Sequence, residues 1–298
     1  HDIGSGWPAA SSGRGIRAMS PSNIRAAAVP SGAVRPAEVT LAYQDEGTGP
    51  AVLVLHGFTE MGHSMEAVSG PLRVQNRVIV PDLIGHGQSD APDHVDPYRT
   101  QAVVSQLTAL LDHLDVDEVA IVGYSLGGRV ALSLACAIPA RISRLVLIAS
   151  TGGIEDDSLR HQRRAADEAL ADSLDAEGIG AFVDHWEALP IFASQQALSP
   201  AVQADIRSTR LGQRTHGLAN SLRGIGAGSM PHLWANLAPV SAPTMLVAGE
   251  LDERYVAFGR RLAAVLSNGR LRVIPGVGHA VHVEAPALCA EVIVDFLT

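Results

Sequence analysis

One serine in the sequence has neighbours that suit a nucleophile. Ser125 lies in the segment 119–132 (VAIVGYSLGGRVAL), with Gly123 two positions before it and Gly127 two positions after it. An apolar run of strand length precedes the serine and one of helical length follows it. A strand that turns sharply into a helix needs small residues at both positions, because the two elements then approach closely. The spacing therefore predicts a nucleophile elbow, with the Ser125 hydroxyl beside a helix N-terminus that favours developing negative charge.

A nucleophilic serine needs a general base and an acid that orients the base, and candidates for both follow later in the chain. Asp252 stands just past the apolar run 245–248, and His279 precedes the last helical segment. The order serine, acid, histidine is that of α/β-hydrolases, in which the acid fixes the imidazole tautomer and the second ring nitrogen takes the serine proton. Glu250 is an alternative acid because it lies closer to the strand end, and His282 is an alternative base.

The oxyanion site of such an enzyme is built from backbone N–H groups. The segment 55–58 (LHGF) forms the loop after an early strand, so we expect the N–H of Phe58 to contribute. The second N–H should be that of Leu126, directly after the predicted nucleophile.

Two other motifs are weak candidates for ligand binding. His279, His282 and Glu284 could suggest a metal site, but a His-x-x-His pair without a third placed ligand is more often ordinary packing. We therefore predict no metal and no cofactor. The Gly-His-Gly turn at 85–87 resembles a phosphate loop, yet its glycine spacing and the segment after it do not match one, so we expect a structural turn.

The elements that must position these residues can be read from hydrophobic periodicity. Continuous apolar strands separated by helices are typical of a mostly parallel sheet with both faces covered. The predicted fold class is therefore α/β, as an α/β-hydrolase fold. The predicted strands are 39–43, 51–55, 77–80, 119–122, 145–148, 244–248 and 270–274, and the predicted helices are 98–114, 126–137, 256–266 and 285–297.

The alternation of strands and helices is interrupted once. Residues 151–239 are mainly helical and polar in pattern, with interspersed arginines, and we expect an inserted helical cap. The core would then comprise 37–150 and 240–298. Residues 1–36 are rich in Gly, Ala, Ser, Pro and Arg and show neither period, so we expect a flexible leader that includes a tag remnant, with Met19 as a native start.

Composition excludes several classes of protein. The formal net charge is −9 and no Lys/Arg-rich run occurs, so nucleic acid is not an expected partner. The chain contains no lysine, which excludes a Schiff-base lysine, a Walker-type lysine and a kinase lysine. No apolar run approaches the roughly 18 residues of a membrane span. Cys136 and Cys289 lie in separate apolar stretches, as expected of buried free thiols, so we expect a cytoplasmic protein without a membrane partner.

Several segments share their sequence with one enzyme family. They are 55–58 (LHGF), 81–89 (PDLIGHGQS), 123–129 (GYSLGGR), 186–194 (WEALPIFAS), 217–223 (GLANSLR) and 278–286 (GHAVHVEAP). In these segments the chain resembles the 2-succinyl-6-hydroxy-2,4-cyclohexadiene-1-carboxylate synthases of menaquinone biosynthesis, from about residue 55 to the C-terminus. The resemblance implies a triad that acts as a base, so that pyruvate is eliminated from a substrate with three carboxylates.

Arg129 points independently to an anionic substrate. It lies four residues after Ser125, and the helical residues 130–137 that follow it are apolar on all sides, so we expect it to be buried. A buried charge is costly unless it is paired. We expect Arg129 to face the site and bind a carboxylate, with a structural pair to a nearby Asp as the alternative.

The resemblance implies further substrate-binding residues. Tyr124 and Trp186 match positions that line the family's pocket, and the family's cap arginines carry over best onto Arg163 and Arg210. Neighbouring arginines are alternatives to these two choices: Arg160, Arg164, Arg207 and Arg214. The family often has Lys-Phe after the acid loop, where this chain has Arg-Tyr at 254–255.

Three functions fit these residues. The first is a synthase that eliminates pyruvate, and the second is a carboxylesterase that acylates Ser125, since the same triad and oxyanion site serve acyl transfer. The third is a non-catalytic ligand-binding relative, against which the complete set of serine, acid and histidine counts. The expected partner is a small anionic or ester substrate, and nothing in the sequence indicates an oligomeric state.

Overall fold

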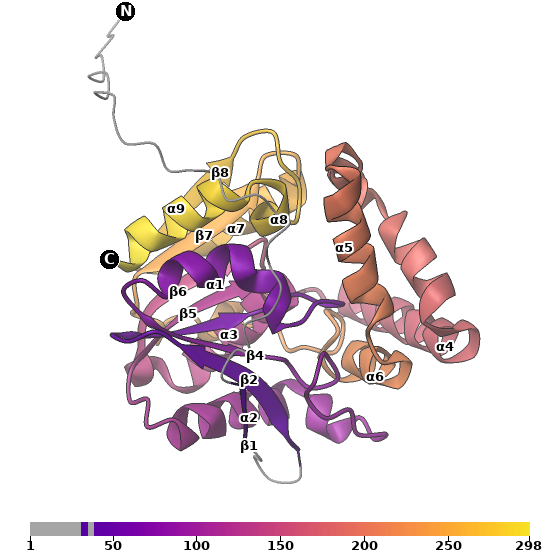
Figure 1. The fold of residues 1–298 in the computed structure, drawn as a ribbon, viewed down its shortest axis with the longest axis horizontal. Helices are drawn as coiled ribbons and strands as arrows, with labels where there is room; N and C mark the ends of the chain where they lie inside the picture. Colours follow the sequence, from indigo (N-terminus) through magenta and orange to yellow (C-terminus); the bar gives the residue numbers. More distant parts are fainter. Residues whose placement is uncertain (1–30, 35–38) are drawn as a thin grey trace, which may run out of the picture.

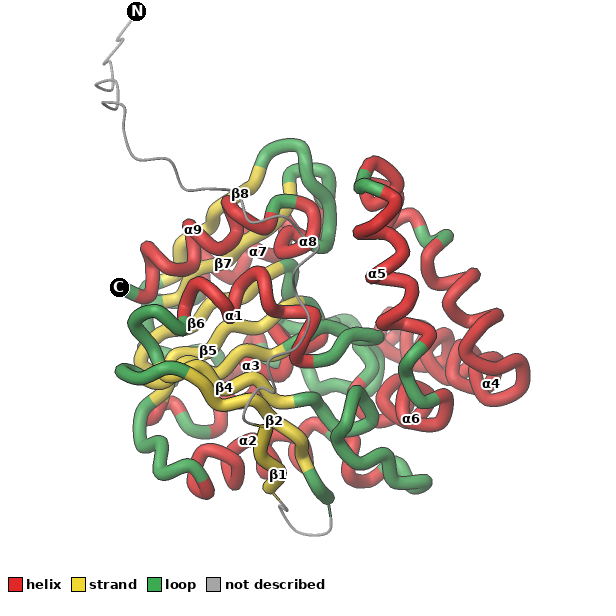
Figure 2. The backbone as a smooth tube through the Cα atoms, viewed as in Figure 1, coloured by secondary structure: helices red, strands yellow, loops and turns green. Residues whose placement is uncertain are grey.

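The computed structural model describes residues 31–34 and 39–298. Within them, eight strands form one sheet in the order β1-β2-β4-β3-β5-β6-β7-β8 (Figure 1, Figure 2). The pairs β1/β2 and β2/β4 are antiparallel, and the other described neighbours are parallel. The α/β-hydrolase fold predicted from the sequence is therefore confirmed. The strands are Ser31–Val34 (β1), Leu41–Glu46 (β2), Ala51–Leu55 (β3), Arg77–Pro81 (β4), Val119–Tyr124 (β5), Ile142–Ile148 (β6), Thr244–Gly249 (β7) and Gly269–Ile274 (β8).

Helices cover both faces of the sheet, and β3 shows why. Successive residues of a strand point to opposite faces, so Leu53 and Leu55 pack into one hydrophobic core while Val52 and Val54 pack into another. All four side chains are fully buried. The first core is covered by α2 (Thr100–His113), α3 (Leu126–Ala137) and α7 (Glu253–Val265), and the second by α1 (Glu66–Leu72) and α9 (Pro286–Leu297), which lie in front of the sheet in Figure 1.

One predicted helix is divided in the structure, and another begins one residue later than expected. The helix expected over 98–114 consists of a 3-10 turn and α2, separated by Arg99, whose ψ of 147° is extended. The helix expected over 285–297 is α9, which begins at Pro286 after the non-helical Ala285 (φ −139°, ψ 62°) and follows the short helix α8 (Val281–Glu284). A residue before proline is disfavoured in helical conformation, which explains this second boundary.

Two elements lie where the sequence shows no periodic pattern. The strand β1 falls within 1–36, the range expected to be a leader, and pairs with β2; residues 1–30 and 35–38, including Met19, lie outside the described residues. The helix α1 contains Gly70 and Pro71, two residues that disfavour helix interiors and mask its apolar face. Short 3-10 helices complete the core: Gly62–Met65 (η2), Asp96–Tyr98 (η3), Pro139–Arg141 (η4) and Trp234–Asn236 (η6).

The segment between β6 and β7 is largely helical. Its helices lie together to one side of the sheet, and the first and the last of its α-helices pack around a small hydrophobic core (Figure 1). The longest one bends at Gly178, whose φ of 81° is not helical. We call them the cap helices: α4 (Asp157–Glu187), η5 (Pro190–Ala197), α5 (Pro200–Leu211) and α6 (Thr215–Ile225).

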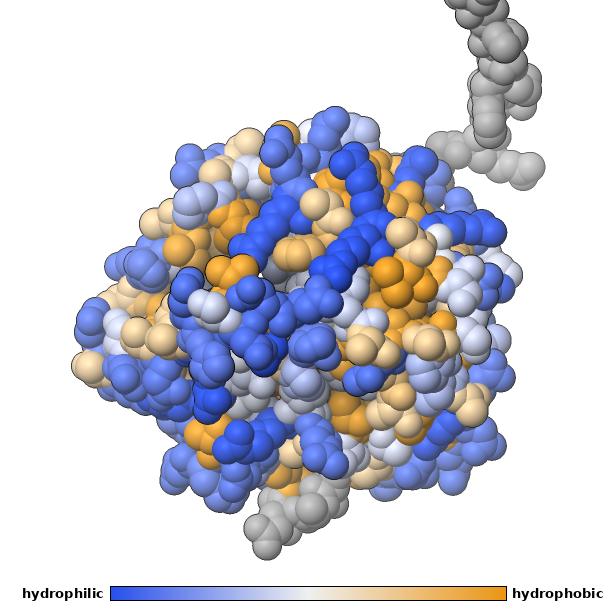
Figure 3. Space-filling view, turned by 180° about the vertical axis from the view of Figure 1, so that it is seen from behind, coloured by the Kyte–Doolittle hydropathy of each residue, from blue (hydrophilic) through white to orange (hydrophobic). Residues whose placement is uncertain are grey.

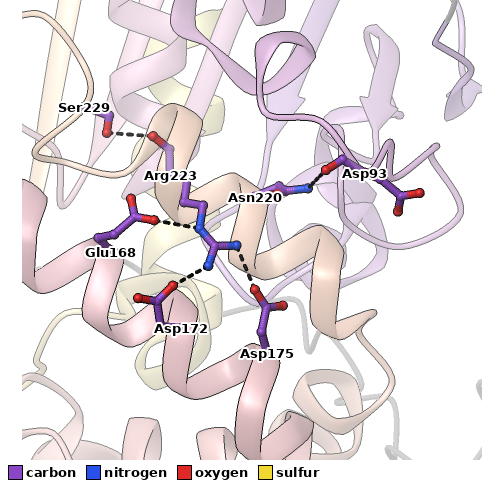
Figure 4. A network of polar contacts seen from close by, with 7 residues as sticks. All are labelled: Asp93, Glu168, Asp172, Asp175, Asn220, Arg223 and Ser229. Carbon is purple, nitrogen blue, oxygen red and sulfur yellow. Dashed lines mark hydrogen bonds and ion pairs between the residues drawn. The ribbon is translucent and has the colours of Figure 1, made fainter.

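One arginine joins two cap helices. The guanidinium of Arg223 on α6 donates to three carboxylates of α4, those of Glu168, Asp172 and Asp175, at 2.6 to 2.9 Å (Figure 4). One turn earlier on α6, the amide of Asn220 donates to the carbonyl oxygens of residues 92 and 93 in the core. The helix α6 is thereby tied to α4 on one side and to a core loop on the other.

The face of the molecule that is turned away from the reader in Figure 1 is of mixed hydropathy. Hydrophilic side chains cover much of it, and hydrophobic residues lie between them in smaller groups (Figure 3). Among the helices of the described residues, none is both long and apolar enough to cross a membrane.

Candidate active site

Ser125 stands at the sharp turn between β5 and α3. Its φ is 49° and its ψ is −106°, an unusual conformation for a residue with a Cβ, and its N–H donates to the carbonyl of Ile148 at 2.9 Å. Both flanking glycines are required. A Cβ at Gly123 would lie 2.4 Å from the carbonyl oxygen of Gly127, and a Cβ at Gly127 would lie 2.3 Å from that of Leu55. The backbone therefore has the geometry of a nucleophile elbow, with α3 starting directly after the serine.

A chain of two hydrogen bonds links Ser125, His279 and Asp252. The Nε2 atom of His279 lies 3.0 Å from Ser125 Oγ, and its Nδ1 lies 2.7 Å from Asp252 Oδ2. The His279 and Asp252 side chains are only 4% and 9% exposed. Asp252 is the N-cap of α7, where its second oxygen accepts the N–H of Tyr255, so the helix start fixes the carboxylate. The structure thus brings the three predicted residues together.

The alternative acid and base lie elsewhere. Glu250 is exposed, and its carboxylate accepts the N–H of Gly276 at 3.0 Å. His282 is fully buried, with Nε2 3.3 Å from Glu60 Oε1 and its ring centroid 4.2 Å from that of Tyr124. Neither Glu250 nor His282 takes part in the hydrogen-bonded chain.

Glu284 braces the loop that carries His279. Its carboxylate accepts the N–H of Gly278 at 2.6 Å and that of Ala280 at 3.2 Å, one on each side of the histidine. Its two oxygens are therefore engaged with backbone groups. In the part of the chain that the structure describes, no group of three or more His, Cys, Asp or Glu side chains is arranged to hold a metal ion.

The Gly-His-Gly turn at 85–87 is held by contacts within the protein. The N–H of Gly87 donates to the Gln213 side chain at 3.1 Å, and the carboxylate of Asp82 accepts the N–H of Gln88 at 2.8 Å. Burial lowers the pKa of His86 to about 3, so its ring is neutral at pH 7. The turn is structural, as expected.

Both residues expected at the oxyanion site line the cavity that contains Ser125. Phe58 follows β3, and Leu126 is the first residue of α3. Within the described residues neither backbone N–H has a hydrogen-bond acceptor. The loop that carries Phe58 packs closely against the residue before Ser125, because a Cβ at Gly57 would lie 2.6 Å from the Tyr124 ring. Two N–H groups are thus free to meet a substrate oxygen beside Ser125.

The cavity has a volume of about 430 Å³ and lies between the core and the cap helices. Tyr124 and Trp186 line it, as predicted, and the indole N–H of Trp186 is buried without a partner among the described residues. Burial is the main reason that the pKa of Tyr124 lies well above its ordinary value, so the phenol is neutral. The charged residues on its walls are four arginines and two carboxylates: Arg129, Arg163, Arg210, Arg254, Glu60 and Asp167.

Arg129 forms no ion pair within the described residues, and the Nη1 atom of its guanidinium is buried without a hydrogen-bond partner. Desolvation lowers its pKa, and the positive charge of Arg163 acts in the same direction. The alternative of a structural pair with an Asp is not found. Arg129 is a half-buried cation on the wall of the cavity, less buried than the helix pattern predicts, and is held by α3 one turn after Ser125.

The two cap arginines chosen from the sequence line the cavity but already carry partners. The Nε atom of Arg163 lies 2.7 Å from Asp167 Oδ1 on the same helix. Arg210, which is nearly buried, lies 3.2 Å from Glu187 Oε1 and stacks over the ring of Phe192. The alternatives do not line this cavity: Arg160, Arg164, Arg207 and Arg214.

Two lining residues were not singled out from the sequence. Phe192 lies inside the segment 186–194 and its ring is 6.2 Å from that of His279. Glu60 follows the oxyanion loop and carries no motif; its proximity in sequence to Phe58 is the signal that could have identified it. Tyr255, noted with Arg254 as a departure from the family pattern, also lines the cavity, and its ring centroid is 4.6 Å from that of His279.

Comparison with known proteins places the chain in a family. Residues 50–286 match the family model of the alpha/beta hydrolase fold. A Bacillus subtilis (strain 168) protein named "Putative 2-succinyl-6-hydroxy-2,4-cyclohexadiene-1-carboxylate synthase" is 40% identical over 262 residues, which cover 87% of this chain and 95% of that protein. The 2-succinyl-6-hydroxy-2,4-cyclohexadiene-1-carboxylate synthase of Escherichia coli O1:K1 / APEC is 31% identical over 238 residues, 80% of this chain and 90% of that protein.

A solved structure agrees with the sequence relatives. The structure of MenH from S. aureus superposes with a TM-score of 0.82 at 33% identity, and the match covers 86% of this chain and 97% of that one. The chain therefore belongs to the α/β-hydrolase superfamily and, within it, to the family of 2-succinyl-6-hydroxy-2,4-cyclohexadiene-1-carboxylate synthases.

Proposed function

We propose that the chain eliminates pyruvate from an enolpyruvyl-succinyl cyclohexene carboxylate in menaquinone biosynthesis, the reaction that the family resemblance implies; its relatives are named as 2-succinyl-6-hydroxy-2,4-cyclohexadiene-1-carboxylate synthases. Ser125, His279 and Asp252 would form the catalytic triad, and the backbone N–H groups of Phe58 and Leu126 the oxyanion hole. The hydrogen-bonded geometry of these residues supports the proposal.

The triad would act as a base. His279 Nε2 takes the Ser125 proton while the serine oxygen removes a proton from a substrate carbon; Asp252 stabilises the imidazolium. The electron pair of the broken C–H bond forms a new C=C bond, and the C–O bond to the enolpyruvyl group breaks. The leaving group departs as the enolate of pyruvate and takes a proton on carbon, while the imidazolium of His279 gives up its proton, so that the triad is restored. Negative charge that develops on a substrate oxygen would be stabilised by the two free N–H groups.

One observation carries the choice of substrate class: Arg129 lies on the cavity wall without an anionic partner among the described residues, and its Nη1 atom is buried. A desolvated guanidinium is stabilised by a carboxylate, which it can bind through two parallel hydrogen bonds. Arg163, Arg210 and Arg254 add positive charge to the same cavity, so a tricarboxylate would find a cation excess there although the whole chain has a net charge of −9.

The cap helices would complete this pocket. They supply Arg163, Trp186 and Arg210, while the core supplies the triad and Arg129. We therefore keep the division into a core of 37–150 and 240–298 and a cap of 151–239 as part of the proposal.

The competing function is a carboxylesterase, since the same serine, histidine and N–H groups could perform acyl transfer. The test compares the purified protein on two substrates, the enolpyruvyl-succinyl cyclohexene carboxylate and short-chain p-nitrophenyl esters. Efficient pyruvate release with slow ester cleavage supports the synthase. Rapid ester cleavage without pyruvate would overturn it.

A further inference from the structure

A second pair of ionisable residues lies at the wall of the cavity, where Glu60 reaches it, and has no part in the chemistry described above. Glu60 and His282 approach to 3.3 Å, between Oε1 and Nε2. The His282 side chain is 0% exposed and that of Glu60 is 18% exposed. They come from opposite ends of the chain, because Glu60 follows β3 and His282 lies on α8. Such a buried pair is costly to form, so its location invites a functional explanation.

Glu60 controls the loop that carries the oxyanion donor. Its Oε2 atom accepts the N–H of Gly57 at 3.0 Å, and its own N–H donates to the Gly57 carbonyl at 3.3 Å. Gly57 directly precedes Phe58, whose N–H is the oxyanion donor in the proposed mechanism. The side chain of Glu60 therefore holds the His56–Gly57 peptide unit, and its backbone N–H holds the next unit, which carries the Phe58 N–H.

The charge state of Glu60 suits this task. Burial alone would raise its pKa, but the contacts with His282 and the hydrogen bond from Gly57 hold the pKa below the ordinary value for a glutamate. The side chain is thus a carboxylate at neutral pH, and a carboxylate accepts hydrogen bonds only.

His282 contacts Glu60 on the other side, at 3.3 Å and without a geometrically regular hydrogen bond. It is part of the short helix that begins two residues after His279, and its ring packs 4.2 Å from that of Tyr124, the residue before Ser125. Contacts of Glu60 and His282 therefore connect the oxyanion loop with the segments that carry the nucleophile and the base.

We propose that Glu60, in contact with His282, is a positioning residue: its side chain fixes the backbone at Gly57, and thereby the direction of the following peptide unit, so that the Phe58 N–H meets the developing oxyanion. This inference rests on the proposed function for the identity of the reaction. A misplacement of about 1 Å in such a donor can cost roughly 100-fold in rate.

The test uses three variants of Glu60 and one control. Glu60→Gln keeps an acceptor of the same length without the charge, Glu60→Asp keeps the charge on a shorter side chain, and Glu60→Ala removes both. Glu66→Ala is the control, because Glu66 lies on α1, pairs with Arg73 and does not line the cavity. Thermal unfolding checks that each variant is folded.

For pyruvate release we expect Glu60→Ala and Glu60→Asp to lower kcat roughly 10- to 100-fold with KM changed by less than about threefold, since the interaction acts on the transition state. Glu60→Gln should stay within about fivefold of wild type, and Glu66→Ala should equal it. Wild-type kcat in Glu60→Ala and Glu60→Asp would overturn the inference. So would a loss in Glu60→Gln as large as in Glu60→Ala, because charge rather than hydrogen-bond acceptance would then matter.

A second readout needs no substrate. Amide hydrogen exchange at Gly57 should be at least about tenfold faster in Glu60→Ala than in wild type, and unchanged in Glu60→Gln. Unchanged exchange in Glu60→Ala would contradict the inference even if the wild type released no pyruvate, so its failure is distinguishable from failure of the proposed reaction. In a double variant, His282→Asn should add little to the loss in Glu60→Ala; additive losses would show that His282 acts independently.

Discussion

The imidazole Nε2 of His279 lies 3.0 Å from the hydroxyl oxygen of Ser125, although 154 positions separate the two residues in the chain. The contact exists because β5 and the loop after β8 end at the same edge of a parallel sheet. The residues of the proposed triad therefore meet at this edge of the sheet.

Removal of the proposed reactive serine should nearly abolish turnover and leave the fold intact. Ser125→Ala deletes only the hydroxyl, and an alanine Cβ occupies the same position, so thermal unfolding should match wild type. Activity should fall by several orders of magnitude. Full activity in this variant would rule out the assignment of Ser125.

Exchange of the acid should distinguish between the two carboxylates near β7. Asp252→Asn retains the shape but reverses the hydrogen bond to His279 Nδ1, which should cost roughly 10⁴-fold in kcat by favouring the wrong tautomer. Glu250→Gln is the matched control and should have little effect, because Glu250 is exposed and bonds to Gly276. The reverse pattern in kcat would mean that Glu250 is the acid.

The elbow should tolerate no side chain at Gly127. A Cβ there would lie 2.3 Å from the Leu55 carbonyl oxygen, so Gly127→Ala should lower the free energy of unfolding by about 3 kcal/mol or more in urea titrations. The control is Gly180→Ala on α4, where a Cβ would meet nothing within 4 Å; it should be neutral or stabilise by up to about 1 kcal/mol. Equal effects of the two changes would contradict the steric account.

Acidification should destabilise the protein through His86. Its folded-state pKa of about 3 lies below the ordinary 6.5, so between these values the unfolded chain binds a proton that the folded chain does not. Stability from this group is complete above about pH 6.5 and is lost as the pH falls, with a limiting slope of about 1.4 kcal/mol per pH unit. Urea unfolding of His86→Gln between pH 7 and 5 should show a shallower pH dependence than wild type. Identical slopes would show that His86 does not contribute.

The sequence predicted those parts of the fold in which local pattern and tertiary structure agree. The apolar run 51–55 matches β3 residue for residue, because a strand buried on both faces must be continuously apolar. The helix 126–137 is likewise matched, because its apolar surface extends all round. Gly70 and Pro71 in α1 break that agreement: packing against α9 stabilises a helix there despite poor local propensity.

The residues of the candidate site likewise include some that the local sequence pattern predicts and some that it does not. Residues tied to strand ends, such as Ser125 and Asp252, could be found because the fold dictates where they stand. For Arg129 the helix pattern predicts burial, but it does not reveal whether a carboxylate lies opposite, since that depends on segments distant in sequence. Glu60 carries no motif, and only the bond to Gly57 distinguishes it from a surface glutamate.

The most direct test of the account replaces Arg129 and measures two reactions. Arg129→Ala should reduce kcat/KM for pyruvate release by roughly 30- to 5,000-fold, the equivalent of the 2 to 5 kcal/mol typical when one partner of a buried charge pair is removed. Hydrolysis of a short p-nitrophenyl ester, which has no carboxylate to offer, should change by only a few-fold. The matched control is Arg164→Ala, an exposed cap arginine outside the cavity, which should release pyruvate as wild type does. Undiminished pyruvate release in Arg129→Ala, or rapid ester cleavage without pyruvate in the wild type, would contradict the account.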